Sequence, residues 1–383
     1  MSGTSAPIRL GLIGTGLAAQ KLHWPALQRL ADRYRVTACC DLSAEAAAAF
    51  AELAQMPEDR FVRSSAALLG RDDVDAVLVT LPIPHLLEAA REALAAGKHV
   101  ICEKPSGGDE AQAKSFVELR REFPDRTLLL AENMFYRDDL RLARRLLDAG
   151  AIGRVHLVAW RFASHWIPRR GQFSGTPWRQ RPQYRGGAHL DNGVHHMAKL
   201  RLLCGEVATL SALTQRANAT IDAPSDLAVD LAFTGGAIGS YAATYTDVPL
   251  PAEPNETRLY GTSGTLVLGE RGARKEVRLH RADEPPQTHS FEGTDNGYWG
   301  ELCNFADALQ HGAPIVGTVQ QSARNLLLVV RALDAAERRQ VTTLEAPWLD
   351  EPPGVPLWQP WGADDWRGPA PGTYTVTHAP PAD

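Results

Sequence analysis

Long apolar runs are absent from this 383-residue sequence, so no segment is expected to cross a bilayer. The N-terminus, MSGTSAPIRL, lacks the charged and then apolar pattern of an export signal. Cysteine is scarce as well: the five cysteines form no CxxC pair, which argues against a zinc knuckle and a disulfide framework. Together these absences predict a reduced, cytoplasmic protein with no membrane partner.

An excess of positive charge is also lacking. The 40 Lys and Arg residues are outnumbered by 45 Asp and Glu residues, which makes the formal net charge −5 at pH 7. This balance offers no support for a nucleic-acid partner. The apolar content of 44% and the charged content of 22% are typical of a soluble globular protein, and the length predicts two domains.

The first third of the chain alternates between apolar runs and helix-forming stretches. Ser43 stands where it can cap the helix of SAEAAAAFAEL, and Gly97 ends a helix over 85–96. Uninterrupted apolar strands that alternate with helices predict a parallel sheet covered on both faces. The expected fold class is therefore α/β, with a doubly wound dinucleotide-binding (Rossmann) domain over residues 1–133. Its apolar runs lie at 8–13, 35–40, 74–82, 99–105 and 127–133.

Strands dominate from residue 134 onward, after one helix over 138–150. Many are joined by short links that contain glycine or polar residues, which are typical of antiparallel strands. The sequence therefore predicts an α+β domain over residues 134–345 with a large, open, mostly antiparallel sheet. Its apolar runs lie at 154–164, 206–215, 226–233, 237–246, 257–262, 264–269 and 276–281, and helices are expected over 296–310 and 318–340.

The last segment, residues 346–383, is rich in proline and tryptophan. Its prolines argue against regular structure, and its tryptophans argue against free disorder. We expect this tail to lie across the body of the protein.

A glycine motif, Gly14-x-Gly16-x-x-Ala19, follows the first apolar run directly. A dinucleotide-binding turn needs this context, because the pyrophosphate lies against an open backbone at a helix N-terminus. We expect the helix to continue as far as Leu30. The cofactor-binding residues predicted around this motif and the next two strand ends are Gly14, Thr15, Gly16, Leu17, Ala18, Asp41, Leu81, Pro82 and His85.

Asp41, at the end of the second apolar run, is predicted to select the cofactor. Its carboxylate can accept both ribose hydroxyls of NAD and would repel the 2′-phosphate of NADP. NADP stays an alternative, because Arg35 and other nearby basic groups could compensate. Asp41 could instead be a turn or capping residue, and His85 could cap a helix in place of contacting the cofactor.

The stretch GGAHLDNGVHHMAKL, residues 186–200, gathers three histidines, an aspartate and a lysine. Asp191, His195 and Lys199 are four residues apart, so a single helix would project all three from one face. That face could be a proton-transfer site, a metal site or the polar side of an ordinary helix. The glycine pair at 186–187 is expected to let the chain approach the site closely.

No metal site is expected in this stretch. His189, Asp191, His195 and His196 offer ligands, but adjacent histidines on a helix point to different sides, and no HExxH motif is present. His196 is expected to pack or to form a hydrogen bond. Lys199 could tune the basicity of His195, bind an anionic substrate or remain a solvated surface residue.

A more specific signal is AGKHVICEKP, residues 96–105. Together with the glycine motif and GGAHLDNGVHH, it resembles the glucose–fructose oxidoreductase, inositol dehydrogenase and rhizopine-catabolism (Gfo/Idh/MocA) family. The resemblance runs along the chain to about residue 346. Ala198 stands where the family pattern often has an aspartate, so this end of the helix is where the protein is expected to differ from its relatives.

The resemblance implies which residues surround the reacting centre. Glu103 and Lys104 would lie beside the nicotinamide, as further cofactor-binding residues, and Asp191 and His195 would face the same ring from the second domain. The resemblance also implies an NAD(P)-dependent dehydrogenase or ketoreductase acting on a CH–OH group of a sugar, cyclitol or related compound. Many members form dimers or tetramers through the sheet, so a homodimer or homotetramer is expected.

The expected chemistry assigns a role to each of these residues. His195 would accept the hydroxyl proton as a neutral imidazole. Lys104 would supply positive charge beside the developing alkoxide, or act as the acid and base itself. Asp191 would orient His195 or bind a neighbouring hydroxyl, and Glu103 would hold Lys104.

The substrate is expected to be a small, sugar-like molecule bound by Trp178, Arg179, Asp191 and His195. Trp178, Arg179 and Tyr184 lie in a segment rich in aromatic and basic residues, and aromatic faces and guanidinium groups suit sugar hydroxyls or an acid group. The alternative for each is a purely stabilising role.

Two other functions are weighed against the dehydrogenase. A glycoside hydrolase could use NAD transiently, without net production of NADH. A non-catalytic NAD(P)-sensing regulator is the other alternative, although the presence of Lys104, Asp191 and His195 argues against it.

Overall fold

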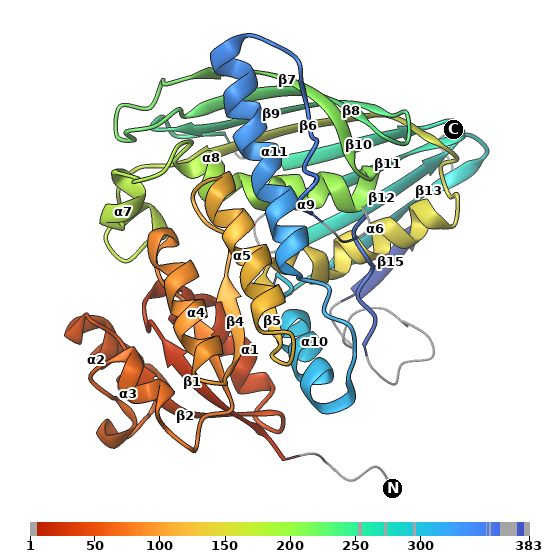
Figure 1. Cartoon of the computed structure of the whole chain (residues 1–383). Coiled ribbons are helices and arrows are strands. Elements are labelled where there is room, and N and C mark those ends of the chain that lie inside the picture. The colour runs from red at the N-terminus through yellow and green to blue at the C-terminus, as the bar shows by residue number, and fades with distance from the viewer. Residues whose placement is uncertain are drawn as a thin grey trace, which may run out of the picture. The chain divides into compact units, whose positions relative to one another are not determined.

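The computed structural model describes residues 6–251, 255–271, 274–293, 296–349, 351, 354–360 and 374–378 (Figure 1). These residues divide into two compact units. The first unit takes residues 6–133 together with Tyr298–Leu326, and the second takes the described residues of Met134–Gly297 and Leu327–Trp358 together with 374–378. The sequence had placed residues 298–326 in the second domain, so the structure differs at this point.

A parallel sheet of five strands forms the centre of the first unit, in the order β2-β1-β3-β4-β5. Residues of β3 and β5 are buried throughout, because helices cover both faces of the sheet. The doubly wound sheet expected from the sequence is confirmed. Its strands are β1 (Ile8–Ile13), β2 (Tyr34–Cys40), β3 (Ala76–Val79), β4 (His99–Glu103) and β5 (Leu128–Ala131).

The helices of this unit begin and end where local chemistry allows. Ser43 Oγ accepts a hydrogen bond from the N–H of Ala46, which confirms the predicted N-cap of α2. Gly97, with φ of +78°, follows α4 as the predicted left-handed glycine. The helical segments are η1 (Ala19–His23), α1 (Trp24–Arg29), α2 (Ala44–Ala54), η2 (Glu58–Arg60), α3 (Ser65–Leu69), η3 (Ile83–His85), α4 (Leu86–Ala95), α5 (Glu110–Glu122) and α10 (Tyr298–His311).

Polar contacts with the start of β2 explain why α10 joins the first unit. The hydroxyl of Tyr34 donates to the carbonyl oxygen of Leu302 at 2.6 Å. Arg33 forms an ion pair with Asp307 at 2.8 Å. Both contacts join residues more than 250 positions apart in the chain, which no local pattern could indicate.

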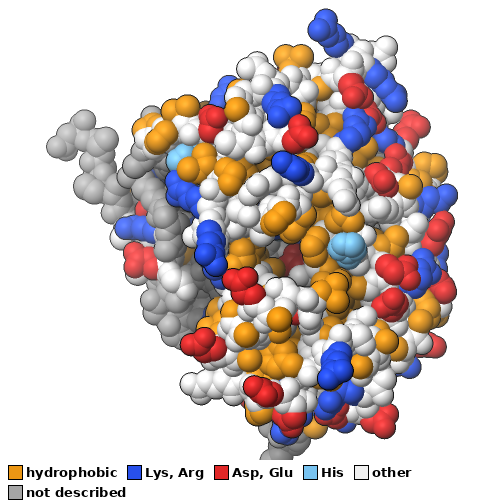
Figure 2. All heavy atoms as spheres, turned by 90° about the vertical axis from the view of Figure 1, so that its left-hand side faces the viewer, with side chains coloured by type: hydrophobic (Ala, Val, Ile, Leu, Met, Phe, Trp, Pro, Cys, Tyr) orange, Lys and Arg blue, Asp and Glu red, His pale blue; other side chains and the backbone are white. Residues whose placement is uncertain are grey.

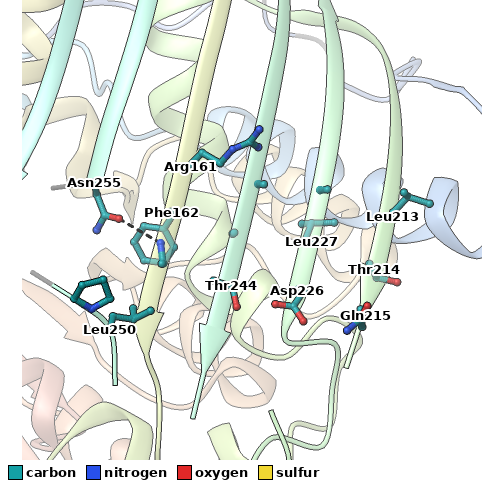
Figure 3. Close-up of a pocket in the computed structure, with 15 residues that line it drawn as sticks. Arg161, Phe162, Leu213, Thr214, Gln215, Asp226, Leu227, Thr244, Leu250 and Asn255 are labelled. Atoms are coloured by element: carbon teal, nitrogen blue, oxygen red, sulfur yellow. Dashed lines mark hydrogen bonds between the residues drawn. The ribbon is translucent and has the colours of Figure 1, made fainter. Parts of the chain in front are cut away.

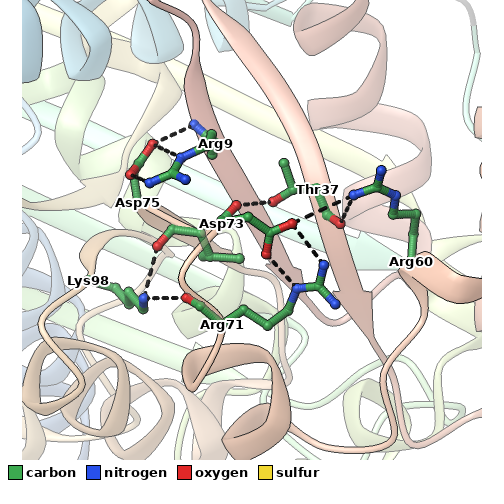
Figure 4. A network of polar contacts seen from close by, with 8 residues as sticks. Arg9, Thr37, Arg60, Arg71, Asp73, Asp75 and Lys98 are labelled. Carbon is green, nitrogen blue, oxygen red and sulfur yellow. Dashed lines mark hydrogen bonds and ion pairs between the residues drawn. The ribbon is translucent and has the colours of Figure 1, made fainter.

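An ion-pair network fixes the amino-terminal edge of the parallel sheet (Figure 4). Arg9 of β1 pairs with Asp75 at 2.6 Å, just before β3 begins, and the bond from Arg9 lowers the pKa of Asp75. Arg71 pairs with Asp73 at 2.7 Å, and Lys98 Nζ donates to the carbonyl oxygen of Arg71. The segment that leads into β3 is therefore anchored from two sides.

The second unit is built on a ten-stranded sheet, in the order β14-β7-β8-β9-β6-β10-β11-β12-β13-β15. Strands β6 and β9 pair in parallel, and the other neighbours are antiparallel, which confirms the expected sheet. The strands are β6 (Val155–His165), β7 (Val207–Gln215), β8 (Asp226–Phe233), β9 (Ile238–Thr246), β10 (Asn255–Gly261), β11 (Gly264–Arg271), β12 (Arg274–Arg281), β13 (Glu284–Phe291), β14 (Thr342–Thr343) and β15 (Tyr374–His378).

In the described part of the chain, helices cover one face of this sheet and leave the other face open. Along β9, Tyr241 and Tyr245 are buried, whereas Ala242 and Thr244 on the opposite face are half-exposed. Figure 1 shows α6 and α9 along the covered face. This alternation is the pattern of a sheet with one core face and one open face. The helical segments here are α6 (Asp138–Asp148), η5 (Phe173–Gly175), α7 (Pro177–Gln180), α8 (Ala188–Asp191) and α9 (Gly193–Cys204); η4 (Asn133–Tyr136) and α11 (Val319–Arg338) belong partly to each unit.

The proline-rich tail contains regular structure that the sequence did not predict. Tyr374–His378 forms β15, which pairs antiparallel with β13 at the sheet edge. The expectation of no regular structure is therefore wrong for this segment, because an unpaired sheet edge offers main-chain hydrogen bonds to any extended chain. The described residues 346–349, 351 and 354–360 contain no helix or strand, as expected, and residues 350, 352–353, 361–373 and 379–383 lie outside the described residues.

Within the tail, Trp358 is an anchor in the core of the second unit. Its side chain is 2% exposed, and its ring packs at 5.6 Å from the ring of Tyr136. The guanidinium carbon of Arg141 lies 4.5 Å from the centroid of the same ring. At this residue the tail does lie across the second unit, as expected.

Among the described residues, no helix is long and apolar enough to span a bilayer.

The substitution Trp358→Ala should destabilise the second unit. Removing a buried indole leaves a cavity and costs about 3–5 kcal/mol of unfolding free energy. Denaturant unfolding measures this loss, and Gln359→Ala, at an exposed neighbouring position, should stay within about 0.5 kcal/mol of the wild type. Equal stability of the Trp358→Ala variant and the wild type would contradict the anchoring role.

Candidate functional site

The turn after β1 can form only with glycine. Gly14 has φ of +92°, and a Cβ at this position would lie 2.8 Å from the carbonyl oxygen of Thr80. Gly16, by contrast, has open space beside it, because no atom outside the local chain lies within 4 Å of where a Cβ would stand. The backbone at Gly16 is therefore open, as a dinucleotide pyrophosphate requires, so these residues fit a bound NAD.

Asp41 lies against the glycine motif. Its Oδ2 accepts hydrogen bonds from the N–H of Thr15 at 2.6 Å and from the Thr15 hydroxyl at 3.1 Å. Its Oδ1 accepts a bond from the N–H of Ser43 at 2.7 Å. Asp41 is therefore a turn residue, as one interpretation held, and it also stands where a ribose ligand is expected.

The remaining cofactor candidates of the first unit lie in the loops that follow the strands. Leu17 and Ala18 follow Gly16, and Leu81 and Pro82 follow β3; all four are half-buried. These positions lie at the carboxyl ends of the strands, where ligands of open α/β sheets bind. His85 is exposed at the N-cap position of α4, but its side chain makes no capping bond, so the capping interpretation is wrong.

The helix expected from the glycine motif to Leu30 is interrupted. A π-helical turn, η1, runs to His23, and the short helix α1 follows it. Pro25 lies in the first turn of α1 and has no N–H to continue a regular helical ladder. The interruption carries His23 into the interior, where it is 0% exposed.

Glu103 and Lys104 stand at the carboxyl end of β4. Oε2 of Glu103 accepts a hydrogen bond from the N–H of Lys104 at 3.1 Å, so Glu103 holds the lysine through its main chain. Oε1 of Glu103 lies 2.8 Å from Nε2 of His23. Sequence reasoning missed His23; the signal for it is a histidine within an apolar stretch on the segment that follows the glycine motif.

In the second unit, Asp191 is held by Arg179. Nε of Arg179 donates to Oδ2 of Asp191 at 2.6 Å, and the two side chains are only 15% and 7% exposed. The guanidinium group also stacks on Trp178, with its carbon 3.9 Å from the ring centroid. The structure thus brings together three of the predicted substrate residues, Trp178, Arg179 and Asp191.

The stretch around His195 forms two helical segments where one was expected. Asp191 ends α8, and His195 lies in α9 after a break at Asn192. The N–H of His195 bonds to the carbonyl oxygen of Asn192 at 3.1 Å, a three-residue spacing that tightens the chain at Gly193, a poor helix former. The expectation that Asp191, His195 and Lys199 project from one continuous helix is therefore wrong at Asp191. His195 is 9% exposed.

The two neighbouring histidines are interior residues. His196 Nδ1 lies 2.5 Å from the hydroxyl of Tyr241, as expected for a hydrogen-bonding role. His189 is 0% exposed and packs against the ring of Tyr245. Burial lowers the pKa of His189 to about 4 and that of His196 well below its usual range. Across the part of the chain that the structure describes, no group of three or more His, Cys, Asp or Glu side chains is placed to hold a metal ion.

Lys199 is not the solvated residue that one interpretation allowed. It is 5% exposed, and its Nζ lies 4.3 Å from the ring centroid of Trp160. Burial lowers the pKa of Lys199 to about 8, although the charge of Glu270 acts in the opposite direction. A lysine with this environment is close to losing its proton under ordinary conditions.

A buried ion cluster lies near Lys199. Arg137 pairs with Asp139 at 2.7 Å and also with Glu270. Burial raises the pKa of Glu270, but the charges of Arg137 and Lys199 outweigh it and bring the pKa to about 2. The cluster therefore keeps Glu270 ionised, and Lys199 lies beside the cluster.

The glycine pair before α8 serves packing within the second unit. Gly186 and Gly187 have φ of +85° and +51°. Side chains here would collide, since a Cβ at Gly187 would lie 2.5 Å from the Cβ of Ala223, and one at Gly186 would lie 2.8 Å from Leu333. The close approach predicted for this pair is thus made to neighbouring elements of the protein.

A separate pocket of about 710 Å³ lies on the open face of the large sheet (Figure 3). Arg161, Leu213 and Thr244 line it from strands β6, β7 and β9, and Asn255 bonds to the N–H of Ala163 at its edge. None of the predicted site residues is among its lining residues. Leu250 and Pro251 of the loop after β9 complete its walls, and its lining residues include neither histidine nor lysine, so it does not resemble the expected catalytic site.

Comparison with known proteins identifies two family regions. The model described as oxidoreductase family, NAD-binding Rossmann fold, matches residues 8–128. The model described as the GFO/IDH/MocA C-terminal domain matches residues 140–267. The first region lies within the first unit, and the second region lies within the second unit.

Individual proteins show the same similarity. A dTDP-3,4-didehydro-2,6-dideoxy-alpha-D-glucose 3-reductase of Streptomyces violaceoruber is 32% identical over 75% of this chain and 76% of its own. An uncharacterised protein of Saccharomyces cerevisiae is 28% identical over 79% of this chain and 88% of its own. An oxidoreductase from Thermotoga maritima of known structure matches 88% of this chain and 98% of its own, at 28% identity and a TM-score of 0.78.

Replacement of the buried lysine, Lys199→Met, should stabilise the protein at pH 7. The pKa of about 8 in the folded protein lies below the ordinary lysine value of 10.5, so burial of the charge opposes folding below pH 8. As the pH rises from 8 to 10.5 this penalty disappears, and the advantage of the variant should shrink by up to about 3 kcal/mol. Urea unfolding at several pH values measures this difference.

Lys199→Arg is the matched control, because arginine keeps its charge throughout this range. The difference in unfolding free energy between Lys199→Arg and Lys199→Met should therefore not shrink as the pH rises. A constant stability difference between the wild type and Lys199→Met from pH 7 to pH 10 would contradict the depressed pKa.

Proposed function

This chain belongs to the Gfo/Idh/MocA family of NAD-binding oxidoreductases, and from that premise we propose that it transfers a hydride between NAD and a carbinol or carbonyl carbon of a sugar, cyclitol or related compound. The observation that carries the proposal is the contact of Asp41 with Thr15, because the carboxylate that we propose for the ribose hydroxyls lies beside an open glycine turn. The residues expected for the chemistry, Lys104, Asp191 and His195, are all present.

NAD is the proposed cofactor in preference to NADP. Asp41 directly follows β2, whereas Arg35 is the second residue of that strand. A strand rises about 3.3 Å per residue, so Arg35 stands roughly 20 Å from Asp41 along β2. Arg35 is therefore too remote to neutralise the repulsion between Asp41 and a 2′-phosphate.

The proposed chemistry divides between proton transfer and charge stabilisation. NAD, when bound, supplies the hydride acceptor. The His195 imidazole takes the proton from the substrate hydroxyl, since a neutral imidazole accepts protons readily near pH 7. The Lys104 ammonium stabilises negative charge on the substrate oxygen. Asp191, held by Arg179, binds a neighbouring hydroxyl, because a carboxylate oxygen accepts more than one hydrogen bond.

A sugar-like substrate is supported by the segment that precedes α8. Tyr184 carries a hydroxyl that is buried and has no hydrogen-bond partner among the described residues, so it can serve a substrate hydroxyl. Five arginines and no acidic residue lie between 166 and 187, and two of the five, Arg179 and Arg185, pair with carboxylates outside this segment. The remaining positive charge favours a sugar that carries an acid group or phosphate over a neutral one. The face shown in Figure 2 has acidic and basic side chains interspersed, which supports a small-molecule partner over a nucleic acid.

The location that we propose is the cytoplasm. The five cysteines are all free thiols, and four of them are buried. Unpaired cysteines are typical of proteins in a reducing compartment.

The functional test is a panel of neutral sugars and cyclitols with their acidic or phosphorylated counterparts, followed by the absorbance of reduced nicotinamide. Lys104→Met and His195→Ala should then each lower kcat by about a hundredfold or more, because each removes an acid–base or charge-stabilising group. The affinity for NAD, measured by calorimetry, should change far less than kcat.

Matched controls are Lys114→Met and His156→Ala, at exposed positions on α5 and β6, which should keep wild-type turnover. Wild-type turnover in both Lys104→Met and His195→Ala would overturn the mechanism. Turnover without net NADH would favour the glycoside hydrolase, and NAD binding without any turnover would favour the regulator.

We also propose that the protein forms a homo-oligomer through the open face of the large sheet. Leu213 and Ile238, on β7 and β9, are 69% and 59% exposed. The loop after β9 adds Val248 at 62% and Leu250 at 39%. Leu213 and Leu250 line the same pocket on this face, and Ile238 lies at the other end of β9, so the exposed apolar side chains are spread along the sheet face. Exposed apolar surface of this extent usually marks a contact surface.

The double substitution Leu213→Asp and Ile238→Asp should convert the oligomer to a monomer, because two buried carboxylates per copy cannot be tolerated in an apolar contact. Analytical ultracentrifugation measures the mass. Leu53→Asp on α2, where the leucine is 48% exposed, should leave the wild-type mass unchanged. A wild-type monomer, or an unchanged mass in the double variant, would contradict this contact.

A further inference from the structure

The proposed chemistry leaves one buried histidine of the first unit unused. We propose that His23 is a positioning residue for Lys104: it fixes the carboxylate of Glu103, and that carboxylate fixes the main chain from which the Lys104 side chain starts. The inference rests on the proposed function, because it gives His23 a part in orienting the group that we place beside the reacting oxygen.

The sequence after the glycine motif places His23 in the interior. In the π-helical turn η1, the N–H of Trp24 donates to the carbonyl oxygen of Ala19, five residues earlier. Such widened turns are rare and occur frequently at functional sites. The turn points the His23 side chain inward, where the residue has no exposed surface. A polar ring in such a place is unfavourable unless it is hydrogen-bonded.

That hydrogen bond is made to Glu103. Nε2 of His23 lies 2.8 Å from Oε1 of Glu103, and the residues are 80 positions apart in the chain. Oε2 of the same carboxylate accepts the N–H of Lys104 at 3.1 Å. Both oxygens of Glu103 are therefore engaged, and the carboxylate cannot rotate without breaking one of the two bonds.

The proton arrangement of His23 follows from its partners. An ionised carboxylate can only accept, so Nε2 must be the protonated nitrogen that donates to Glu103. Nδ1 has no hydrogen-bond partner in the described part of the chain. The neutral tautomer protonated at Nε2 suits both observations, because it leaves no buried donor unsatisfied.

The ring itself is held in place by packing. The imidazole meets the ring of Tyr298 edge-on, with centroids 5.2 Å apart and planes at 75°. Tyr298 is the first residue of α10, which belongs to the same unit. His23, the last residue of η1, is thus held against α10, with Nε2 directed at Glu103.

This chain of contacts ends at Lys104, the first residue after β4. Loss of the His23 bond would remove the contact that fixes one oxygen of this nearly buried carboxylate, and the carboxylate would then be able to turn. Such a turn releases or strains its bond to the Lys104 N–H and redirects the lysine side chain. Displacements of about 1 Å in a positioned group are enough to lower a reaction rate by about a hundredfold.

The test compares His23→Leu with His23→Gln, since glutamine presents an amide N–H in place of Nε2 and leucine presents none. His23→Leu should lower kcat by about tenfold or more through loss of one charge-assisted bond, with the KM for NAD nearly unchanged. His23→Gln should recover most of the loss.

A second readout uses the cofactor-free protein and does not depend on turnover. Acetic anhydride labels lysine amines, and peptide mass spectrometry gives the rate at each site. In His23→Leu the labelling rate of Lys104, relative to that of Lys98, should change severalfold, and in His23→Gln it should return to the wild-type ratio. Nitrogen-15 NMR of His23 should show a protonated Nε2 and a bare Nδ1.

His99→Leu is the matched control. His99 is the first residue of β4, and its Nδ1 accepts the N–H of Thr127 at 3.0 Å. Its loss removes a histidine hydrogen bond from the opposite end of the same strand, so the melting temperature should fall while the Lys104 labelling ratio and kcat remain unchanged.

Two results would overturn the inference. The first is wild-type kcat and labelling in a folded His23→Leu variant. The second is an equal loss of kcat in folded His23→Leu and His23→Gln variants, which would indicate that His23 acts through packing alone. Lys104→Met separates this from the proposed function. If that variant keeps full turnover, the proposed function fails; if it loses turnover while His23→Leu keeps it, only the role of His23 fails.

Discussion

The close approach of main chain at Gly14 is the constraint on which the first unit depends. With no side chain at this position, the end of β1 can lie against Thr80, whose hydroxyl donates to the Gly14 carbonyl oxygen at 2.7 Å. The N–H of Gly14 bonds in turn to the carbonyl oxygen of Cys40. One turn therefore ties the carboxyl ends of β1, β2 and β3 together. The same turn presents Thr15 to Asp41 and leaves Gly16 open, so fold and cofactor recognition share one geometric cause.

The carboxylates that we propose for the chemistry in both units are held by polar pairs in places that exclude most water. Glu103 is held by His23 and by the main chain of Lys104, and Asp191 is held by Arg179. Such pairs seldom increase stability, because each removes two polar groups from water. They do restrict where a carboxylate can point before any substrate arrives, which is the form of preorganisation that charge-stabilising catalysis requires. Lys199 differs, since its ammonium lies over the ring of Trp160 instead of forming such a pair.

Local patterns in the sequence were sufficient for most strands and for several helix ends. The apolar runs that became β1 and β8, and the cap at Ser43, depend on neighbours within a few residues. The errors involve distant partners. The placement of α10 depends on Tyr34, the strand β15 depends on the free edge of β13, and the burial of Lys199 depends on the sheet beneath α9. In the candidate site, motifs indicated where Asp41 and Glu103 stand in the chain, whereas nothing local indicated the contact of His23, because its partner lies 80 residues away.

The central claim is that hydride moves directly between substrate and nicotinamide. Its most direct measurement uses a substrate deuterated at the carbinol carbon, with mass spectrometry of the nicotinamide product after one turnover. The account predicts that the reduced nicotinamide carries one deuterium and that the reaction is slower with the labelled substrate. A reduced nicotinamide without deuterium, or deuterium released into water, would contradict direct transfer and with it the function assigned to this chain.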